Sequence, residues 1–279
     1  MVDEAVEKSR AVWDEMAPGW ERYHEYMWEM TRHVGEWLVD RVDLRDGDTI
    51  LDLAGGPGHN GFLAAERLGS SGKVIVTDFA PQMVEVARRL ADQKGLDNVE
   101  TRQLDAQDMD LDDDSVDGII CRWGFMLMLE PETALKECRR VLKDGRNLAM
   151  SVWGSPEKNP WVTVTGMTMM QLGHEPSGDP FGPGGMFSMA DPDTIRSMLE
   201  GAGFTGITIE EMPVEWRFAS FEEDWEFTTN VAGALAAAVK EFPADEVERL
   251  RTALEANLEP FRTDSGLVTP GVTINVRAS

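Results

Sequence analysis

Short apolar runs alternate with amphipathic segments through the middle of the chain. Each run is bounded by glycine or acidic residues, which is the pattern of a buried β-strand. Five such strands are predicted, over residues 49–54, 73–77, 98–104, 118–122 and 147–152. Helices are predicted between them, over 59–68, 81–94 and 131–143. Repeated strand–helix units of this length predict an α/β fold with a doubly wound, parallel sheet.

The two ends of the chain depart from this alternation. The first forty-odd residues are predicted to form two aromatic-rich helices, broken at Pro18-Gly19. After residue 153 comes a Met-rich apolar segment, WVTVTGMTMMQL, and then a Gly/Pro-rich loop. The remaining predicted elements are a helix over 191–202 capped by Asp191, a strand over 204–218, helices over 221–239 and 244–258, and a strand over 267–277. These last two strands predict an antiparallel edge to the sheet.

Charge and composition narrow the class of protein. With 279 residues, the chain is long enough for one large domain or for two small ones. Asp and Glu number 51 against 26 Lys and Arg, and a net charge of −25 repels nucleic-acid phosphates and anionic lipids. No apolar run approaches the ~20 residues of a membrane span, and the charged start does not resemble a signal peptide. We therefore expect a cytoplasmic protein without nucleic-acid partners, whose acidity reflects either solubility or adaptation to high salt.

The cysteines and histidines do not predict a metal site. Cys121 and Cys138 do not form a CxxC pair and lie in a predicted strand and helix, so we expect buried, reduced thiols. The four histidines are scattered, without the spacing of metal ligands.

The sequence DLAGGPGHNG, residues 52–61, carries the most specific chemical signal. It contains G-x-G-x-x-G between a predicted strand and a predicted helix, and Asp78 follows Gly58 by twenty residues. This spacing is typical of a carboxylate that binds ribose hydroxyls. The pattern favours a nucleoside-containing ligand. The alternative is that the glycines only let the strand and the helix pack closely.

Acidic residues near this motif favour a cationic nucleoside over a dinucleotide. Asp52, four residues before Gly56, would repel a pyrophosphate but suits the ammonium and sulfonium groups of S-adenosylmethionine. Asp105, after the third strand, could accept a hydrogen bond from the adenine amino group, or could serve a turn or helix cap. Asp52 could equally brace the loop. Met83 could pack on the adenine or belong to the core.

Four segments together resemble a known family: ILDLAGGPG, VIVTDFAPQMVEVAR, QLDAQDMDLDDDSVD and ALKECRRVLKDG. They are similar to class I S-adenosylmethionine-dependent methyltransferases, in particular to the ubiquinone/menaquinone-biosynthesis C-methyltransferases. The similarity covers residues 49–153. It implies a Rossmann-like fold with a seven-stranded, mostly parallel sheet of order 3-2-1-4-5-7-6. Strand seven would be antiparallel, with residues 204–218 as strand six and 267–277 as strand seven.

The resemblance also implies a cofactor site and a division of the chain. S-adenosyl-L-methionine would be bound by Asp52, Ala54, Gly55, Gly56, Gly58, Asp78, Phe79, Met83, Asp105, Ala106, Cys121 and Arg122. We expect a single methyltransferase domain over 1–279. It would comprise a helical cap (1–45), a cofactor-binding core (46–154) and two substrate-lid insertions (155–190 and 221–262). His59 departs from the family pattern, because the quinone enzymes usually have an acid there.

The expected reaction is methyl transfer to a carbon or oxygen of a small, apolar or aromatic molecule. Its pocket would be lined by Trp20, Tyr23, Trp123, Phe125 and Met126. Candidate bases, needed only if the acceptor holds a proton at neutral pH, are His59, His24, His174 and Tyr23.

Two other functions fit parts of the pattern. The glycine motif alone also occurs in NAD-dependent oxidoreductases, but Asp52 and Asp105 argue against a dinucleotide, and no Tyr-x-x-x-Lys hydride-site motif is present. The second is a cofactor-binding protein that has lost catalysis and acts through partners.

Overall fold

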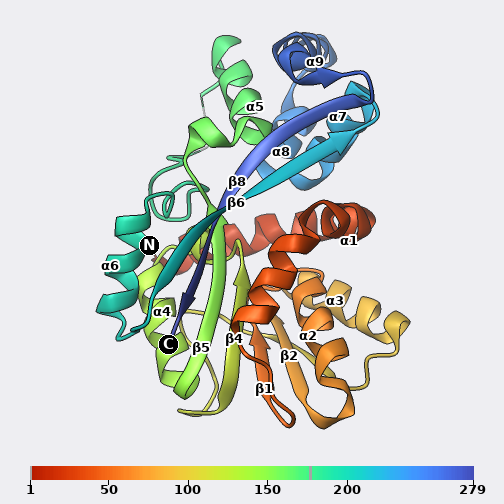
Figure 1. Ribbon diagram of the computed structural model, residues 1–279. Coiled ribbons are helices and arrows are strands. Elements are labelled where there is room, and N and C mark those ends of the chain that lie inside the picture. Colours follow the sequence, from red (N-terminus) through yellow and green to blue (C-terminus); the bar gives the residue numbers. More distant parts are fainter. Residues whose placement is uncertain (1, 176–177) are drawn as a thin grey trace.

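The computed structural model describes residues 2–175 and 178–279, and a single mixed sheet organises it (Figure 1). The strand order is β3-β2-β1-β4-β5-β8-β6, with a short β7 paired to β8. The strands are β1 Thr49–Asp52, β2 Lys73–Asp78, β3 Val99–Gln103, β4 Val116–Arg122, β5 Leu142–Trp153, β6 Thr208–Phe218, β7 Arg262–Thr263 and β8 Gly266–Ala278. Strands β1 to β5 are parallel, and β8 is antiparallel to both β5 and β6. The predicted order and antiparallel strand are confirmed, and β7 is an additional strand.

The crossover helices divide between the two faces of the sheet. Helices α2 His59–Leu68 and α3 Pro81–Lys94 lie on one face, and α4 Pro131–Val141 lies on the other. Successive right-handed crossovers run from β1 toward β3 and from β4 toward β5, in opposite directions, so they cover opposite faces. The long helix α1 contacts both α2 and α3, whereas α4 contacts α6 Pro192–Gly201. The predicted helices over 59–68 and 81–94 are confirmed.

The N-terminal region is one helix, α1 Val2–Arg41, and the predicted break at Pro18-Gly19 is wrong. Pro18 lies on the exposed side of the helix, where its missing N–H costs one hydrogen bond, while Met16 and Ala17 beside it are buried. Gly19 serves a close contact instead: a Cβ there would lie 2.0 Å from the carbonyl oxygen of Asn230. Tertiary packing therefore carries the helix through the proline. No helix within residues 2–175 and 178–279 is both long and apolar enough to cross a membrane.

A two-stranded ribbon projects from the main sheet and carries the remaining helices. Only Thr273–Ala278 of β8 pair with β5, but Leu267–Arg277 pair with the whole of β6, so the rest of both strands extends beyond the parallel strands. Figure 1 shows this ribbon flanked by helices. They are α5 Pro160–Gln171, α7 Phe221–Val231, α8 Gly233–Glu241 and α9 Ala244–Leu258. The ribbon is thus the scaffold of the segments that we expected to form a lid.

Local signals account for several boundaries in this region, and tertiary structure for others. Asp191 caps α6 as predicted, because its side chain accepts hydrogen bonds from the amides of Asp193 and Thr194. The predicted helix over 221–239 is instead two helices, since the backbone at Ala232 is extended. The Met-rich segment forms α5, and the helix over 244–258 is confirmed as α9.

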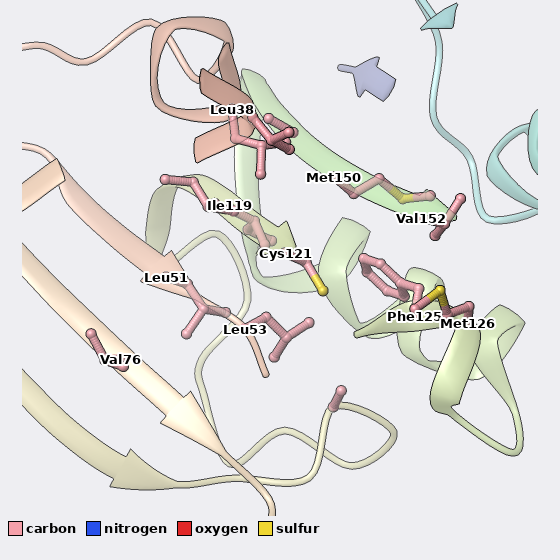
Figure 2. Packing of buried hydrophobic residues seen from close by; sticks show 14 of the residues in the cluster. Leu38, Leu51, Leu53, Val76, Ile119, Cys121, Phe125, Met126, Met150 and Val152 are labelled. Atoms are coloured by element: carbon pink, nitrogen blue, oxygen red, sulfur yellow. The ribbon is translucent and has the colours of Figure 1, made fainter. Parts of the chain in front are cut away.

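The hydrophobic core lies between the strands and the helices that cover them. Figure 2 shows part of it, where Leu51, Ile119 and Met150 from neighbouring strands pack together. Cys121 and Cys138 are buried free thiols, as predicted, and burial raises the pKa of Cys121 to about 12.

Replacing Pro18 with alanine tests the continuity of α1. The substitution supplies the N–H that the proline lacks and relieves the clash with the preceding turn. Without the proline the unfolded chain is more flexible, and this offsets part of the gain. We therefore expect the free energy of unfolding to rise by about 2 kcal/mol. The measurement is urea denaturation of Pro18→Ala beside Val12→Ala, an exposed change on the same helix. If the free energy of unfolding fell for Pro18→Ala but not for Val12→Ala, the chain would need a break in the helix at this position.

Candidate active site

The loop that follows β1 crosses the carboxyl ends of its two neighbouring strands. The amide of Leu53 donates to the carbonyl of Ile120 on β4 (2.8 Å), and the amide of Gly55 donates to Thr77 on β2 (2.7 Å). Because the chain turns in opposite directions from β1 and β4, this point is the switch point where open α/β sheets bind ligands. The loop therefore forms the floor of a crevice.

Two kinds of constraint explain the glycines of this loop. Gly56 and Gly58 have positive φ angles of 53° and 89°, which side chains disfavour. A Cβ at Gly61 would lie 2.5 Å from Cγ2 of Val76 and 2.9 Å from Oδ2 of Asp52. Close packing, the alternative interpretation of the motif, is thus confirmed at Gly61, but it does not explain Gly56, whose Cβ would meet only Trp20 at 3.9 Å.

Strained backbone marks the two loops that meet at the crevice. Ala54 in the loop after β1 and Trp123 after β4 both have positive φ, 50° and 61°. Such angles cost about 1–3 kcal/mol for non-glycine residues and gather at functional sites. The loops touch here, since a Cβ at Gly124 would lie 2.7 Å from the Cβ of Ala54.

Asp52 is fully buried beneath the loop. Its Oδ2 accepts a hydrogen bond from the amide of Gly61 (2.8 Å), which is the loop-bracing role considered above. Its Oδ1 has no hydrogen-bond partner within residues 2–175 and 178–279. Burial raises the pKa of Asp52 to about 7, although the Gly61 amide and Arg122 act in the opposite direction. The site thus holds a buried carboxylate oxygen without a donor.

Asp78 ends β2 and holds the loop from the other side. Its Oδ2 accepts from the amide of Gly56 (3.1 Å) and its Oδ1 from the amide of Ala80 (3.0 Å). Burial raises the pKa of Asp78 to about 6, against the effect of these amides. The carboxylate therefore ties the glycine loop to the start of α3.

Beyond Asp78 lies a cavity of about 200 Å³. Its lining comes from the ends of β2 and β3 and from α1, and consists of Val6, Arg10, Phe79, Gln103, Leu104 and Asp105. Asp105 serves a turn, because its Oδ1 accepts from the amide of Gln107 (2.9 Å), but it also lines the cavity. Met83, Ala106 and Cys121, three of the expected cofactor contacts, belong to the buried core.

Helix α1 covers the crevice. Asp14 accepts a hydrogen bond from the amide of Gln82 at the start of α3 (2.9 Å), and Glu21 pairs with Arg89 on the same helix (2.9 and 2.7 Å). Trp20 lies over the glycine loop at Gly56. Sequence analysis missed Val6, Arg10 and Asp14, since nothing in the mixed pattern of this region indicates which partner each residue meets.

A continuous aromatic cluster connects the crevice with the ribbon. We define it by the residues Tyr23, Tyr26, Trp123, Trp153, Trp161, Trp216, Phe218 and Phe227. Ring centroids are 4.2 Å apart for Trp123–Trp153 and 4.8 Å for Trp153–Trp161. The series continues through Trp216 and Phe227 to Tyr23 at 5.3 to 5.5 Å per step. Of the predicted pocket residues, Tyr23 and Trp123 belong to this cluster.

Phe125 and Met126, two of the predicted pocket residues, are buried next to the aromatic cluster, because Sδ of Met126 accepts a hydrogen bond from the amide of Trp153 (3.4 Å). Both form the short 3₁₀ turn Phe125–Leu127 after β4 and are buried in the core (Figure 2). The turn is held from the outside, where the Ser188 hydroxyl donates to the carbonyl of Met126 (2.8 Å). Their apolar side chains therefore fill the space under the sheet end.

Polar atoms without partners occur inside the aromatic cluster. The indole N–H groups of Trp123 and Trp216 and the hydroxyl of Tyr23 are buried without a hydrogen-bond partner in the described part of the chain. Buried polar groups are nearly always satisfied, and an unmade hydrogen bond costs about 1–3 kcal/mol. The cluster therefore offers donors to a bound molecule.

His59 is poorly suited to accept a proton. The His59 ring stacks between His24 and Trp28, at 5.1 and 5.2 Å, and its Nε2 lies 3.0 Å from Nδ1 of His24. Burial, assisted by Arg122 and His24, lowers the pKa of His59 to about 3, so it is a weak base. His174 bonds Glu246 on α9 (2.8 Å), and the structure does not bring it together with the other two.

Two further ionisable residues border the aromatic cluster. Arg122 donates to the Thr31 hydroxyl and lies over the Trp123 ring at 4.7 Å. Burial lowers the pKa of Arg122 to about 10. On α7, Asp224 is buried, which raises its pKa to about 7, and it contributes to the raised pKa of Tyr26 after the main effect of burial. The sequence did not point to Asp224, because it follows two exposed glutamates.

Comparisons with known proteins agree with this geometry. A family described as "Methyltransferase domain" matches residues 44–173. A ubiquinone/menaquinone biosynthesis C-methyltransferase from Idiomarina loihiensis is 26% identical over 185 residues, covering 63% of this chain and 74% of the relative. An arsenite methyltransferase from Halobacterium salinarum is 28% identical over 195 residues, 70% of this chain but only 46% of the relative.

Solved structures share the fold. The YcgJ protein from Bacillus subtilis aligns with a TM-score of 0.59 at 20% identity, over 88% of this chain and 97% of that protein. Phosphoethanolamine N-methyltransferase 2 from Haemonchus contortus, solved with S-adenosyl-L-methionine, has a TM-score of 0.55 at 15% identity, over 88% of this chain and 52% of that one. The family match, the relatives and the shared fold, together with the crevice at the β1/β4 switch point, lead to one conclusion. Residues 44–173 match a methyltransferase domain, and the chain is similar to the class I S-adenosylmethionine-dependent methyltransferases, in particular to their ubiquinone/menaquinone-biosynthesis group.

Proposed function

We propose that the enzyme transfers the methyl group to a carbon or oxygen of a small, apolar or aromatic molecule bound at the aromatic cluster. The observation that carries this proposal is the set of buried, unpartnered N–H and O–H groups among these rings. The cluster borders the crevice on two sides: Trp123 follows β4 beside the glycine loop, and Tyr23 lies one helical turn from Trp20. A flat molecule with oxygen acceptors would satisfy these donors and exclude water from the reacting atoms.

The cofactor would occupy the crevice with its cationic end near Asp52. The unpartnered Oδ1 of Asp52 suits an ammonium donor, Asp78 suits the ribose hydroxyls, and Asp105 suits the adenine amino group. We assign the remaining contacts to Ala54, Gly55, Gly56, Gly58 and Phe79 in the same loops and to residues of the adjoining elements, namely Met83 on α3, Ala106 after β3, and Cys121 and Arg122 at the end of β4. When bound, S-adenosylmethionine supplies a methyl group on a positively charged sulfur that departs as a neutral thioether. The chain mainly aligns the acceptor with that methyl group, which can contribute ~7–11 kcal/mol.

An aromatic acceptor fits this chain better than arsenite. Trivalent arsenic is a soft centre that needs thiolate ligands. The chain has two cysteines, both buried in the core, and burial raises the pKa of each thiol. The similarity to an arsenite methyltransferase therefore does not extend to its substrate in our proposal, whereas a quinone-like ring would suit the aromatic cluster.

Asp224 is the residue that we propose accepts a proton from the acceptor. It shares one face of α7 with Phe227, which packs against Tyr23 and Trp216 of the cluster. Its pKa of about 7 places the ionised form within reach of neutral pH, unlike that of His59. The acceptor oxygen or carbon would thus lose its proton to Asp224 as it takes up the methyl group.

We also propose the remaining features that the sequence led us to expect. The protein would be cytoplasmic and would not bind nucleic acid. Its single domain would consist of a cap (1–45), a cofactor-binding core (46–154) and two substrate lids (155–190 and 221–262). His24, His59 and His174 become structural residues in our account. A catalytically inactive cofactor-binding protein is the alternative, and the acceptor screen described below distinguishes it.

Calorimetric titration followed by an acceptor screen tests the proposed function. We expect S-adenosylmethionine and S-adenosylhomocysteine to bind and NAD to show no heat. Incubation with labelled S-adenosylmethionine and a panel of quinols, phenols, amines and arsenite should then give labelled product with the quinols or phenols. Label on arsenite or amines alone would contradict the proposed substrate class, and binding without product from any acceptor would favour the inactive alternative.

Substitution of Asp224 by asparagine tests the proposed proton acceptor. The variant keeps the side-chain shape but cannot take up the proton, so turnover with the acceptor from the screen should fall at least ~100-fold. S-adenosylhomocysteine affinity should not change, and wild-type turnover should rise with pH through about 7, as Asp224 ionises. Glu222→Gln, an exposed acid on the same helix, is the control. Undiminished turnover of Asp224→Asn would remove Asp224 from the mechanism.

A further inference from the structure

A second cavity, of about 210 Å³, is formed by α1, α2 and the end of α3. Trp28 and Arg32, one helical turn apart on α1, line one wall, and Lys94, the last residue of α3, lines another. The face of α2 that begins at His59 completes the lining. None of the lining residues in the described part of the chain belongs to the glycine loop or to the aromatic cluster. Neither the cofactor nor the proposed methyl acceptor therefore accounts for this space.

The buried part of the lining is aromatic. The His59 ring stacks on Trp28, with centroids 5.2 Å apart and planes 9° from parallel, and the Phe62 ring meets His59 edge-on at 6.0 Å. Phe62 also contacts the glycine loop, because a Cβ at Gly58 would lie 2.7 Å from its ring. The cavity therefore offers a flat, apolar floor next to the cofactor loop, which suits a flat organic group.

One ring nitrogen of His59 is left for a ligand. Its Nε2 lies 3.0 Å from Nδ1 of His24, whereas its Nδ1 has no hydrogen-bond partner within residues 2–175 and 178–279. His59 is only 6% exposed, but Nδ1 is not sealed from solvent, and the cavity is the space that this side chain lines. When Nε2 accepts the hydrogen of His24, the neutral His59 ring carries its own hydrogen on Nδ1. The floor of the cavity then presents an N–H donor.

The charged residues at the mouth of the cavity reverse the charge balance of the chain. Two bases, Arg32 and Lys94, and one acid, Glu66 of α2, line it, in a chain with 51 acidic and 26 basic residues. Arg32 pairs through Nε with exposed Glu36 (2.9 Å), which leaves its two terminal nitrogens for another acceptor. Within residues 2–175 and 178–279, neither Lys94 nor Glu66 forms an ion pair. The mouth therefore carries a net positive charge that the protein itself does not neutralise.

We propose that this cavity is a binding site for a small, flat organic acid, separate from the site of methyl transfer. The carboxylate of the ligand accepts hydrogen bonds from Lys94 and from the Nδ1–H of His59, and Arg32 adds positive charge at the mouth. The flat part of the ligand packs against Trp28 and Phe62. Glu66 opposes the anion, so the charge at the mouth sets the affinity.

Titration of the protein with benzoate, followed by ligand-observed NMR, tests this site. Benzoate should bind at least about fivefold more tightly than benzamide, which has the same ring without the charge. Lys94→Met should weaken benzoate binding about fivefold, and Glu66→Gln should strengthen it by a similar factor, because the two changes alter the charge at the mouth in opposite directions. Lys136→Met, which removes an exposed positive charge from α4, should match the wild type.

Several outcomes would overturn the inference. Absence of benzoate binding, or equal affinity for benzamide, would show that the cavity does not select a carboxylate. Unchanged affinity in both Lys94→Met and Glu66→Gln would place the bound benzoate elsewhere, such as at the aromatic cluster. Weaker binding in both variants would show that these residues only support the fold. The titration does not depend on the cofactor, so a failure of S-adenosylhomocysteine to bind would contradict the proposed function and leave this site intact.

Discussion

Two carboxylates, Asp52 and Asp78, are buried where neighbouring parallel strands end. The geometry of the crevice follows from the hydrogen-bond donors that buried carboxylates need. An ionised carboxylate is costly to bury unless donors surround it. Here the donors are backbone amides of Gly61, Gly56 and Ala80, so the loop after β1 must bend back over the strand ends. The positive φ angles of Gly56 and Gly58 and the close packing at Gly61 are consequences of that bend.

The amides do not compensate the two charges completely. Burial raises the pKa of both carboxyl groups, and Asp78 raises that of Asp52 further. One oxygen of Asp52 also lacks a donor in the described part of the chain. A cationic ligand would supply what the amides do not, which is why this crevice suits a sulfonium cofactor better than a diphosphate.

The sequence predicted the elements whose signals are local. Buried strands, the proline that opens α3 and the Asp191 cap depend on neighbouring residues, and the strand order followed from the family resemblance. Pro18 shows the limit of local signals, since the helix continues through it only because α1 packs against α7. The break between α7 and α8 at Ala232 could not be predicted either, because it lies in an apolar, alanine-rich stretch.

The residues of the candidate site also fall into two groups, those with a local signal in the sequence and those without one. Asp52, Asp78 and Asp105 end strands and could be located by spacing alone. The aromatic cluster joins residues from five elements and the loop after β4, from Tyr23 to Phe227, and no local pattern connects them. For Phe125 and Met126 the sequence could not decide between a pocket and a core turn, because apolar residues after a strand are compatible with both. Asp224 lies among other charged residues and is distinguished from them only by its burial.

The number of protons exchanged when S-adenosylmethionine binds tests the central claim most directly. With pKa values of about 7 for Asp52 and about 6 for Asp78, the two carboxyl groups together hold about one proton at pH 6.5, part of which a cationic ligand should expel. Calorimetry in two buffers of different ionisation enthalpy measures this exchange. Our account predicts net proton release at pH 6.5, less release for Asp52→Asn, and weaker binding as the pH falls toward 5. Proton uptake at pH 6.5, or equal release from both proteins, would contradict it.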